Sequence, residues 1–170
     1  MVHTAEEPNT PIAFDQLPLS PETLTAIEAI GYQYATPVQA GAIPPAIDGR
    51  DLMVQSQTGT GKTAAFSLPL IERLKGSPHI GALALAPTRE LARQVMEEAR
   101  RLSAHSKDFS VTCIYGGVSF DDQVSAIKQN PTLVVGTPGR VLDHLRRGTL
   151  SLKALQCFVL DEADEMLSMG

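Results

Sequence analysis

The sequence predicts an α/β domain in which a parallel β-sheet carries helices on both faces. Short apolar runs alternate with helix-like segments along the chain, which is the order that builds parallel sheets. The runs lack alternating polar residues, as is typical of strands buried on both sides. They cover residues 51–55, 81–86, 111–115, 132–136 and 157–161. Sheets of this kind bind ligands beyond the carboxyl ends of their strands, so we expect the functional residues there.

The composition is that of one folded domain without a membrane segment. The chain has 170 residues, of which 43% are hydrophobic, and this is enough for a single core. No apolar run approaches the roughly 20 residues that span a bilayer. Residues 1–11 are polar and lack the apolar centre of a signal peptide, so a loose tail is expected. Cys113 and Cys157 lie in apolar runs and are predicted to be buried free thiols, which favours a cytoplasmic protein.

Charge, aromatic content and histidine spacing limit the ligands that can bind. The net charge of −5 argues against a broad basic face for nucleic acid. Aromatic residues make up 5% of the chain and Trp is absent, so extended base stacking is not expected. Binding through a few well-placed donors is compatible with this composition. The four histidines, at positions 3, 79, 105 and 144, lack metal-ligand spacing and are expected on the surface.

Two helices are expected before the first apolar run. Ser20 as N-cap and Gly31 as terminator bound the first of them. Thr36 caps the second, and the Pro44-Pro45 pair is expected to kink or restart it.

A phosphate-binding loop is predicted between the apolar run 51–55 and a helical pattern over 62–74. The stretch SQTGTGKT matches the pattern of Gly, four residues and Gly-Lys-Ser/Thr, except that Ser56 replaces the first glycine. A small residue is needed there because backbone passes close by, and serine is small enough. The loop consists of Ser56, Gln57, Thr58, Gly59, Thr60, Gly61, Lys62 and Thr63.

The residues of this loop suit a nucleotide phosphate with Mg²⁺. Gly59 and Gly61 let the backbone curl so that its N–H groups converge on phosphate oxygens, and the helix N-terminus adds partial positive charge. Lys62 can reach the terminal phosphates, and the Thr63 hydroxyl can bind Mg²⁺. From the loop alone, a glycine-rich turn with an incidental lysine is the alternative.

A helix with one apolar face is predicted over residues 89–102. Arg93, Glu97 and Arg100 lie on its polar side. Its apolar stripe consists of Ala92, Val95, Met96, Ala99 and Leu102.

An acidic cluster follows the last apolar run, in FVLDEAD at residues 158–164. Beside a phosphate loop, Asp161 can hold Mg²⁺ through water, and Glu162 can orient or deprotonate an attacking water. The alternative is a solvated helix start, where acidic residues suit the helix dipole. The phosphate loop upstream favours the catalytic interpretation.

Five motifs, in this order and at this approximate spacing, resemble those of the DEAD-box RNA helicases. They are SQTGTGKT at 56–63, PTRELA at 87–92, GG at 116–117, TPGR at 137–140 and DEAD at 161–164. The resemblance runs from about Phe14 to the end of the chain. It implies that residues 12–170 form an incomplete RecA-like domain that binds ATP and Mg²⁺. In that family, the implied catalytic residues are Lys62, Asp161 and Glu162, and the implied metal positions are Thr63 and Asp161.

The resemblance also implies that residues 14–39 recognise adenine. In the family an upstream aromatic ring stacks on adenine and a glutamine recognises its edge, and Phe14 and Gln39 stand at those positions. A glutamine amide can pair with adenine N6 and N7, which selects ATP over GTP. Ala35 departs from the proline that is common in the family, so a looser loop is expected there. Without the resemblance, a polar residue on a helix surface is the favoured interpretation of Gln39.

RNA is the partner that the resemblance implies. PTRELA and TPGR each follow an apolar run and begin a helix, so each offers hydroxyl, backbone N–H and guanidinium donors to phosphate. In the family these segments and the glycine pair contact the sugar–phosphate backbone without sequence preference. Without the resemblance, plain N-capping by threonine with surface arginines is the favoured interpretation. The implied RNA-binding residues are Pro87, Thr88, Arg89, Gly117, Thr137, Pro138, Gly139 and Arg140.

The resemblance implies an ATP-dependent RNA helicase whose ATP site is completed by a second RecA-like domain. One alternative is an ATP-gated RNA clamp that separates few strands. Another is a P-loop ATPase or nucleotide kinase that does not act on RNA.

The family's strand order predicts a gap in the sheet of this chain. In that order, the strand after DEAD lies between the phosphate-loop strand and the DEAD strand. Both flanking strands would then lose ladder partners, and each buried unsatisfied group costs roughly 1–3 kcal/mol. We therefore expect the isolated chain to be marginally folded, to bind adenine nucleotide weakly, and neither to hydrolyse ATP at a useful rate nor to unwind RNA.

Overall fold

The computed structural model describes residues 11–57 and 59–168 and confirms an α/β fold with a parallel sheet flanked by helices. The chain forms two compact units, the first made of residues up to 75 with 101–107 and the second of residues 76–100 with 108–170. The expected tail over residues 1–11 lies outside the described residues except for Pro11. Thr58 of the phosphate loop lies outside them as well.

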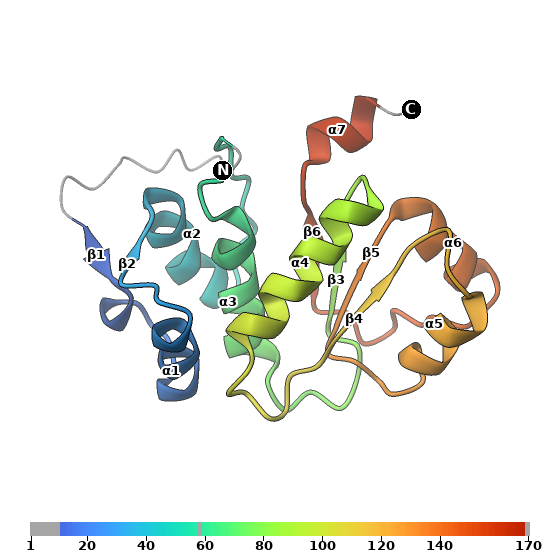
Figure 1. Ribbon diagram of the computed structural model, residues 1–170, viewed down its shortest axis with the longest axis horizontal. Helices are drawn as coiled ribbons and strands as arrows, with labels where there is room; N and C mark the ends of the chain where they lie inside the picture. The colour runs from blue at the N-terminus through green and yellow to red at the C-terminus, as the bar shows by residue number, and fades with distance from the viewer. Residues whose placement is uncertain (1–10, 58, 169–170) are drawn as a thin grey trace. The chain divides into compact units, whose positions relative to one another are not determined.

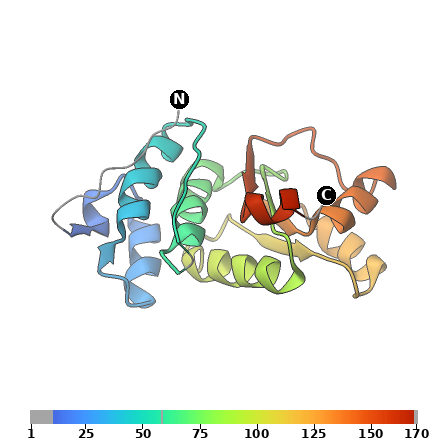
Figure 2. The ribbon, with the colours of Figure 1, turned by 90° about the horizontal axis from the view of Figure 1, so that it is seen from above.

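The first unit consists mainly of helices. Its elements are β1 (Ile12–Ala13), the 3-10 helix η1 (Phe14–Gln16), α1 (Pro21–Ala29), β2 (Tyr34–Ala35), α2 (Pro37–Ile47) and α3 (Lys62–Leu74). Helices α2 and α3 lie side by side (Figure 2), and Ile43, Leu68 and Ile71 are fully buried. Strands β1 and β2 form a short antiparallel pair in which Ile12 is opposite Ala35. Ala35 therefore lies in a strand and not in the looser loop that was expected.

Helix α2 begins as the sequence predicts but does not break where it predicts. Thr36 and Gln39 form a reciprocal capping box at its start. The expectation of a kink or restart at Pro44-Pro45 is wrong, because α2 runs unbroken from Pro37 to Ile47. The prolines lie in its last turns, and their own carbonyls still accept from Asp48 and Arg50 at 3.1 and 3.0 Å.

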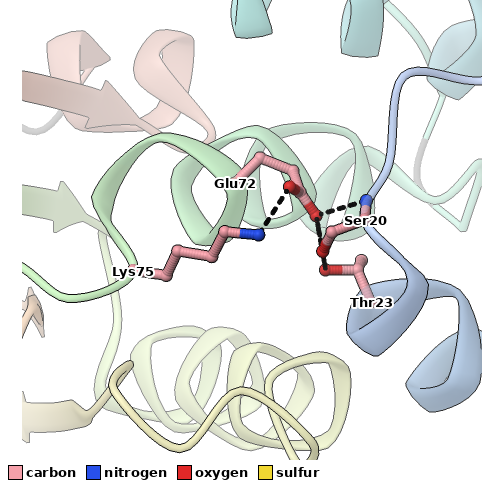
Figure 3. A network of polar contacts seen from close by, with 4 residues as sticks. All are labelled: Ser20, Thr23, Glu72 and Lys75. Atoms are coloured by element: carbon pink, nitrogen blue, oxygen red, sulfur yellow. Dashed lines mark hydrogen bonds and ion pairs between the residues drawn. The ribbon is translucent and has the colours of Figure 1, made fainter.

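A polar network joins α1 to α3 (Figure 3). The Ser20 N–H, the Ser20 hydroxyl and the Thr23 hydroxyl donate to Glu72 Oε1 at 3.0, 2.8 and 2.5 Å, and Lys75 Nζ lies 3.3 Å from Oε2. Ser20 is the N-cap residue, as predicted, but its hydroxyl contacts Glu72 and caps no backbone N–H. Burial alone raises the pKa of Glu72, but the bonds from Thr23 and Ser20 and the charge of Lys75 outweigh it, so the pKa lies below its ordinary value.

Residues 51–55, predicted as the strand before the phosphate loop, form no strand. All five are described, and Met53 and Val54 are 73% and 44% exposed. An extended segment leaves its backbone groups unpaired unless another strand lies beside it. No strand of the described residues pairs with this run. The apolar pattern alone therefore did not suffice to predict a strand here, because a strand also requires a neighbouring strand to pair with.

The second unit contains the sheet, whose four parallel strands follow the order β4-β5-β3-β6 (Figure 1). Its elements are β3 (Ala82–Leu85), α4 (Arg89–Leu102, whose last two residues belong to the first unit), β4 (Val111–Ile114), α5 (Phe120–Ile127), β5 (Leu133–Gly136), α6 (Pro138–Arg146), β6 (Cys157–Leu160) and α7 (Ala163–Ser168). Gly136 is opposite both Leu85 and Ile114, and Leu85 is opposite Leu160. All four strands therefore end at one level, which we call the carboxyl edge.

Helices pack on this sheet through apolar side chains. The predicted stripe of α4 is confirmed, because Ala92, Val95 and Ala99 are at most 1% exposed. On its polar side, Arg93 forms an ion pair with Glu97 at 3.5 Å. A second set of buried side chains joins three strands to α5 and α6, namely Leu83, Ile114, Val134, Ile127 and Val141.

Strand β6 is the least covered strand of the sheet. Its Phe158 and Leu160 are 54% and 51% exposed, whereas every residue of β5 is buried. Among the described residues, β6 pairs only with β3. The expectation that this strand lacks a ladder partner on one side is met, and the strand that would cover it stays a prediction.

The structure corrects one expectation about the histidines. His79 and His105 are exposed as expected, and His3 lies outside the described residues, but His144 is fully buried. Its burial is possible because both ring nitrogens have hydrogen-bond partners within the unit. No helix within the described part of the chain has the length and apolarity needed to cross a bilayer.

Candidate functional site

The phosphate loop adopts the backbone conformation that its glycines predict. Gly59 and Gly61 have φ of 79° and 85°, a left-handed region that side chains other than glycine rarely adopt. Helix α3 begins at Lys62 directly after this turn. The first backbone N–H groups of α3 therefore point toward the loop, where the partial positive charge of the helix favours an anion.

Hydrogen bonds within the phosphate loop close it on itself. The Ser56 and Thr60 hydroxyl oxygens lie 2.8 Å apart, and the Thr60 hydroxyl lies 2.8 Å from the Gln57 carbonyl oxygen. Lys62 Nζ donates to the Ser56 carbonyl at 3.0 Å. Ser56, which replaces the usual glycine, thus fits the loop and supplies two of its internal contacts. The Lys62 ammonium points across the loop.

The candidate adenine segment is bonded to the phosphate loop. Gln39 Nε2 donates to the Gly61 carbonyl at 3.2 Å, and the Thr36 hydroxyl donates to the Thr60 carbonyl at 2.8 Å. Gln39 Oε1 accepts from the Thr36 N–H at 2.9 Å, and Gln39 is only 3% exposed. The amide that the resemblance assigns to the adenine edge therefore also supports the phosphate loop. Thr36, which the sequence marked only as a helix cap, is a second residue that supports the loop.

Phe14 lies near this segment but is used for packing. It is 3% exposed, and its ring stacks on Tyr32 with centroids 6.2 Å apart and an interplanar angle of 19°. Stacking of Phe14 on adenine stays a prediction, which in this conformation requires the ring to leave its buried position. The ring of Tyr32, at 36% exposure, is the more accessible of the two.

The carboxyl edge of the second unit brings four candidate segments together. Residues 116–117 follow β4, residues 137–140 follow β5, residues 87–89 follow β3 and residues 161–162 follow β6. Because the strands end at one level and lie in the order β4-β5-β3-β6, the segments form a row in that order. The PTR, GG and TPGR segments are thus neighbours in space, although 20 to 53 positions separate their members in the chain.

Arg89 covers the glycine pair. A Cβ on Gly117 would lie 2.8 Å from Arg89 Nη1, and Gly117 has a φ of 88°. Thr88 caps α4 by accepting from the Leu91 N–H at 3.2 Å, while an exposed Glu90 lies 3.8 Å from the Arg89 guanidinium. At this distance and exposure the ion pair adds little, so Arg89 is held mainly by its place over Gly117.

Arg140 reaches the same turn from α6. Its Nη1 donates to the Val118 carbonyl at 3.3 Å, and its guanidinium carbon lies 5.6 Å from the centre of the Phe120 ring. Thr137 is the N-cap residue of α6 but makes no side-chain cap bond. The Thr88 side chain thus caps its helix, as the alternative interpretation expects, whereas the Thr137 side chain makes no capping bond.

Close packing beneath this edge requires a glycine that sequence reasoning missed. A Cβ on Gly136 would lie 2.7 Å from Val141 Cγ2 and 2.8 Å from the Ile114 carbonyl oxygen. Gly136 is the last residue of β5 and precedes TPGR. Its absence of a side chain therefore sets how closely α6 begins beside β4. The only signal in the sequence was a glycine at the end of an apolar run.

The acidic residues occupy the end of β6. Asp161 is 7% exposed, and its N–H donates to the Leu85 carbonyl at 2.9 Å. Glu162 has a φ of 53°, which is uncommon for a residue other than glycine. Helix α7 begins directly after it at Ala163. Unusual backbone conformations of this kind gather at functional sites.

Together the fold and these turns define a RecA-like α/β domain with a phosphate loop. A family model described as DEAD/DEAH box helicase matches residues 36–170. The chain therefore belongs to the DEAD/DEAH box helicase family.

Curated relatives and solved structures agree with this assignment. ATP-dependent RNA helicase DeaD of Klebsiella pneumoniae is 51% identical over 160 residues, which is 92% of this chain and 25% of that protein. The protein of the same name from Escherichia coli (strain K12) has the same identity and coverage. This chain thus spans about a quarter of the length of the curated relatives it matches.

Two solved structures show the same fold. A DEAD box protein from the hyperthermophile Methanococcus jannaschii matches with a TM-score of 0.88 and 44% identity, over 94% of this chain and 44% of that one. A hypothetical ATP-dependent RNA helicase from Sulfolobus tokodaii matches with a TM-score of 0.83 and 35% identity, over 89% and 44%.

Proposed function

We propose that this chain is the first RecA-like domain of an ATP-dependent RNA helicase. It binds ATP with Mg²⁺, the phosphates at the phosphate loop of the first unit, and it binds the RNA sugar–phosphate backbone at the carboxyl edge of the second. In the full-length protein, a second RecA-like domain completes the ATP site and hydrolysis drives duplex unwinding. The half-buried free thiols of Cys113 and Cys157 are compatible with a cytoplasmic protein.

The common level of the strand ends is the observation that carries this proposal. It aligns Arg89, Gly117 and Arg140, and both arginines contact the turn at residues 116–118. The row offers cationic and backbone donors to phosphates. We therefore expect binding that depends on the backbone and not on base sequence.

The phosphate loop fits a nucleotide triphosphate with Mg²⁺. Its two left-handed glycines leave the concave backbone that phosphate oxygens require, and α3 begins immediately behind them. Lys62 would hold the terminal phosphates and the Thr63 hydroxyl would hold the cation, which would neutralise charge on the phosphates. Asp161 and Glu162, at the end of β6, are the residues that the resemblance to the family assigns to the cation and to the attacking water.

ATP turnover in the full-length protein tests these roles. Lys62→Ala and Glu162→Gln should each abolish RNA-stimulated phosphate release, whereas Lys107→Ala, which removes an exposed lysine, should not. Turnover near the wild-type rate in either site variant would contradict the assignment. The isolated chain is expected to bind an ATP analogue weakly and to release no phosphate at a useful rate.

RNA binding tests the carboxyl edge. Arg89→Ala and Arg140→Ala should weaken single-stranded RNAs of different sequence by about the same factor, measured with a non-hydrolysable ATP analogue. Arg93→Ala is the matched control, because Arg93 lies on α4 one turn after Arg89 and pairs only at the surface with Glu97. Effects confined to one base composition would contradict backbone recognition.

Two results would favour the other functions. RNA that is held until hydrolysis, with no strand separation, would indicate a clamp. Absence of RNA binding with or without the analogue would indicate a P-loop ATPase or nucleotide kinase.

A further inference from the structure

A buried polar cluster lies beneath the glycine turn, which we define as residues 115–119. Its centre is His144 of α6, a fully buried side chain whose ring stacks on Phe120 of α5 with centroids 4.2 Å apart and an interplanar angle of 9°. Gln123, also of α5, is 5% exposed and lies between His144 and the turn. The cluster therefore connects the helix that TPGR begins to the segment that carries Gly117.

The hydrogen bonds of the cluster assign the ring proton. Gln123 Nε2 donates to the Tyr115 carbonyl at 2.9 Å, which leaves Gln123 Oε1 facing His144 Nε2 at 3.2 Å. An amide oxygen only accepts, so Nε2 of His144 carries the proton. His144 Nδ1 lies 2.8 Å from the Thr149 hydroxyl, whose one proton can go to Nδ1 or to the His144 carbonyl oxygen 3.1 Å away. The bond to Gln123 therefore requires the neutral ring to be the Nε2–H tautomer.

The two ends of the glycine turn are held by the two sides of this cluster. Tyr115, before the glycines, is bonded through Gln123 to His144. Val118, after them, accepts from Arg140, which lies one turn before His144 on α6. Arg140 and Arg147 also contact the Phe120 ring, at 5.6 and 4.4 Å from its centre.

We propose that His144 is a positioning residue for RNA binding: through Gln123 it holds the glycine turn in register with TPGR, so that Gly117 and Arg140 meet one RNA backbone together. The inference rests on the proposed RNA-binding function of this edge. His144 itself touches no RNA, because it is fully buried.

The surroundings of His144 keep it neutral. Burial lowers its pKa, the Arg140 and Arg147 charges lower it further, and Asp143 opposes them. Phe120, which stacks on the His144 ring, carries no charge. A neutral ring leaves the face of Phe120 available to the two arginines, whereas an imidazolium would compete with them for it.

Two amide substitutions separate positioning from simple packing. His144→Gln places an amide nitrogen near the position of Nε2 and keeps a donor for Gln123, whereas His144→Asn places it near Nδ1 and keeps only the Thr149 contact. Both lose the ring stack and one of the two links, so their losses of stability should be similar. With the full-length protein, a labelled single-stranded RNA and a non-hydrolysable ATP analogue, His144→Gln should bind within about twofold of wild type. His144→Asn should bind roughly threefold to tenfold more weakly, as expected for the loss of one hydrogen bond.

The outcomes distinguish failure of this inference from failure of the proposed function. Equal affinity in both variants, with a normal loss on Arg140→Ala, would overturn the positioning role and leave RNA binding in place. No RNA binding by the wild type would overturn the proposed function itself. If both variants unfold, nitrogen chemical shifts of the His144 ring in the wild type decide, since a protonated Nδ1 with a bare Nε2 contradicts the link to Gln123.

Discussion

The phosphate loop of the first unit and the strand-end turns of the second unit use the same residue types with different support. In the second unit, each candidate turn follows a strand whose backbone is paired in the sheet. In the first unit, the loop follows residues 51–55, which form no strand and expose Met53 and Val54. The phosphate loop is held instead by side chains, through Thr36 to Thr60 and through Gln39 to Gly61.

The difference shows that a strand depends on its neighbours as well as on its own apolarity. The run 51–55 is apolar only at its three central residues and has no strand beside it, whereas the run 133–136 is apolar up to its final glycine and has strands on both sides, β4 and β3. Paired backbone groups stabilise a strand end and the turn after it, whereas a loop without that support depends on a few hydrogen bonds. We therefore expect changes in packing to affect the second unit most, and changes in side-chain bonds to affect the first.

The largest expected effect is on the sheet. Gly136→Ala places a Cβ within 2.8 Å of the Ile114 carbonyl and of Val141, and overpacking of this kind costs about 1–3 kcal/mol. Urea unfolding should show this loss in the second unit. Gly116→Ala, which meets no atom within 4 Å, is the matched control and should stay close to wild type. An unchanged Gly136→Ala variant would mean that α6 can move away from β5 at little cost.

The second effect is on the phosphate loop. Gly61→Ala forces alanine to a φ of 85° and places its Cβ against Gln39 Nε2, and the left-handed backbone alone costs roughly 1–2 kcal/mol. An ATP analogue should bind about tenfold more weakly, which corresponds to about 1.4 kcal/mol. Gly139→Ala, at a position with open space, should leave analogue binding unchanged. Equal binding by both variants would show that the loop has no need for glycine at position 61.

The third effect isolates the support that side chains give the loop. Thr36→Val removes the bond to the Thr60 carbonyl and the N-cap bond from the Gln39 N–H, with an expected loss of about 1 kcal/mol. Hydrogen exchange of the amides around residues 59–61 should accelerate. Thr25→Val is the control, because it removes a hydroxyl on the exposed face of α1. Faster exchange across the β3–β5 ladder instead would contradict local support.

The smallest effect is a difference in acid sensitivity between the units. The pKa of His144 lies below its ordinary 6.5, so the unfolded chain takes up a proton that the folded second unit resists, and stability falls as the pH drops below 6.5. The pKa of Glu72 lies below its ordinary 4.5, so its contribution to the first unit is present above pH 4.5 and is lost as the pH falls through the folded value.

Unfolding measured from pH 7.5 downward tests both windows. His144→Gln should flatten the decline below pH 6.5, and Glu72→Gln should flatten the one below pH 4.5. His79→Gln, which removes an exposed histidine, should leave the profile as in the wild type. A decline below pH 6.5 that persists in His144→Gln would assign it to another group.

Local signals in the sequence predicted much of the fold. The helix stripe of Ala92, Val95 and Ala99, the cap at Thr36 and four of the five strands depend on neighbouring residues, and the structure confirms them. The unbroken helix through Pro44-Pro45 was not predicted, because prolines usually interrupt helices. Here the carbonyls of both prolines still accept backbone hydrogen bonds, from Asp48 and Arg50. Motif order predicted which segments gather at the carboxyl edge, since parallel strands end on one side of a sheet.

The sequence did not predict which side chains from distant segments contact one another. His144 was expected at the surface because no spacing pattern marked it, and its burial depends on Gln123 and Thr149, which reach it from other segments. The burial of Phe14 against Tyr32 and the bond from Gln39 to Gly61 are likewise contacts between segments. A one-dimensional pattern carries no distance between such residues.

By itself the sequence determined the class of fold, the phosphate loop, the candidate RNA segments and the family to which they belong. These follow from residue types at short spacing, which set backbone conformation and local charge. Only the tertiary structure decided that residues 51–55 are not a strand, that Gly136 sets the approach of α6, and that His144 lies beneath the glycine turn. Each of these depends on what packs or pairs beside the residue, and pairing and packing are decided where distant parts of the chain meet.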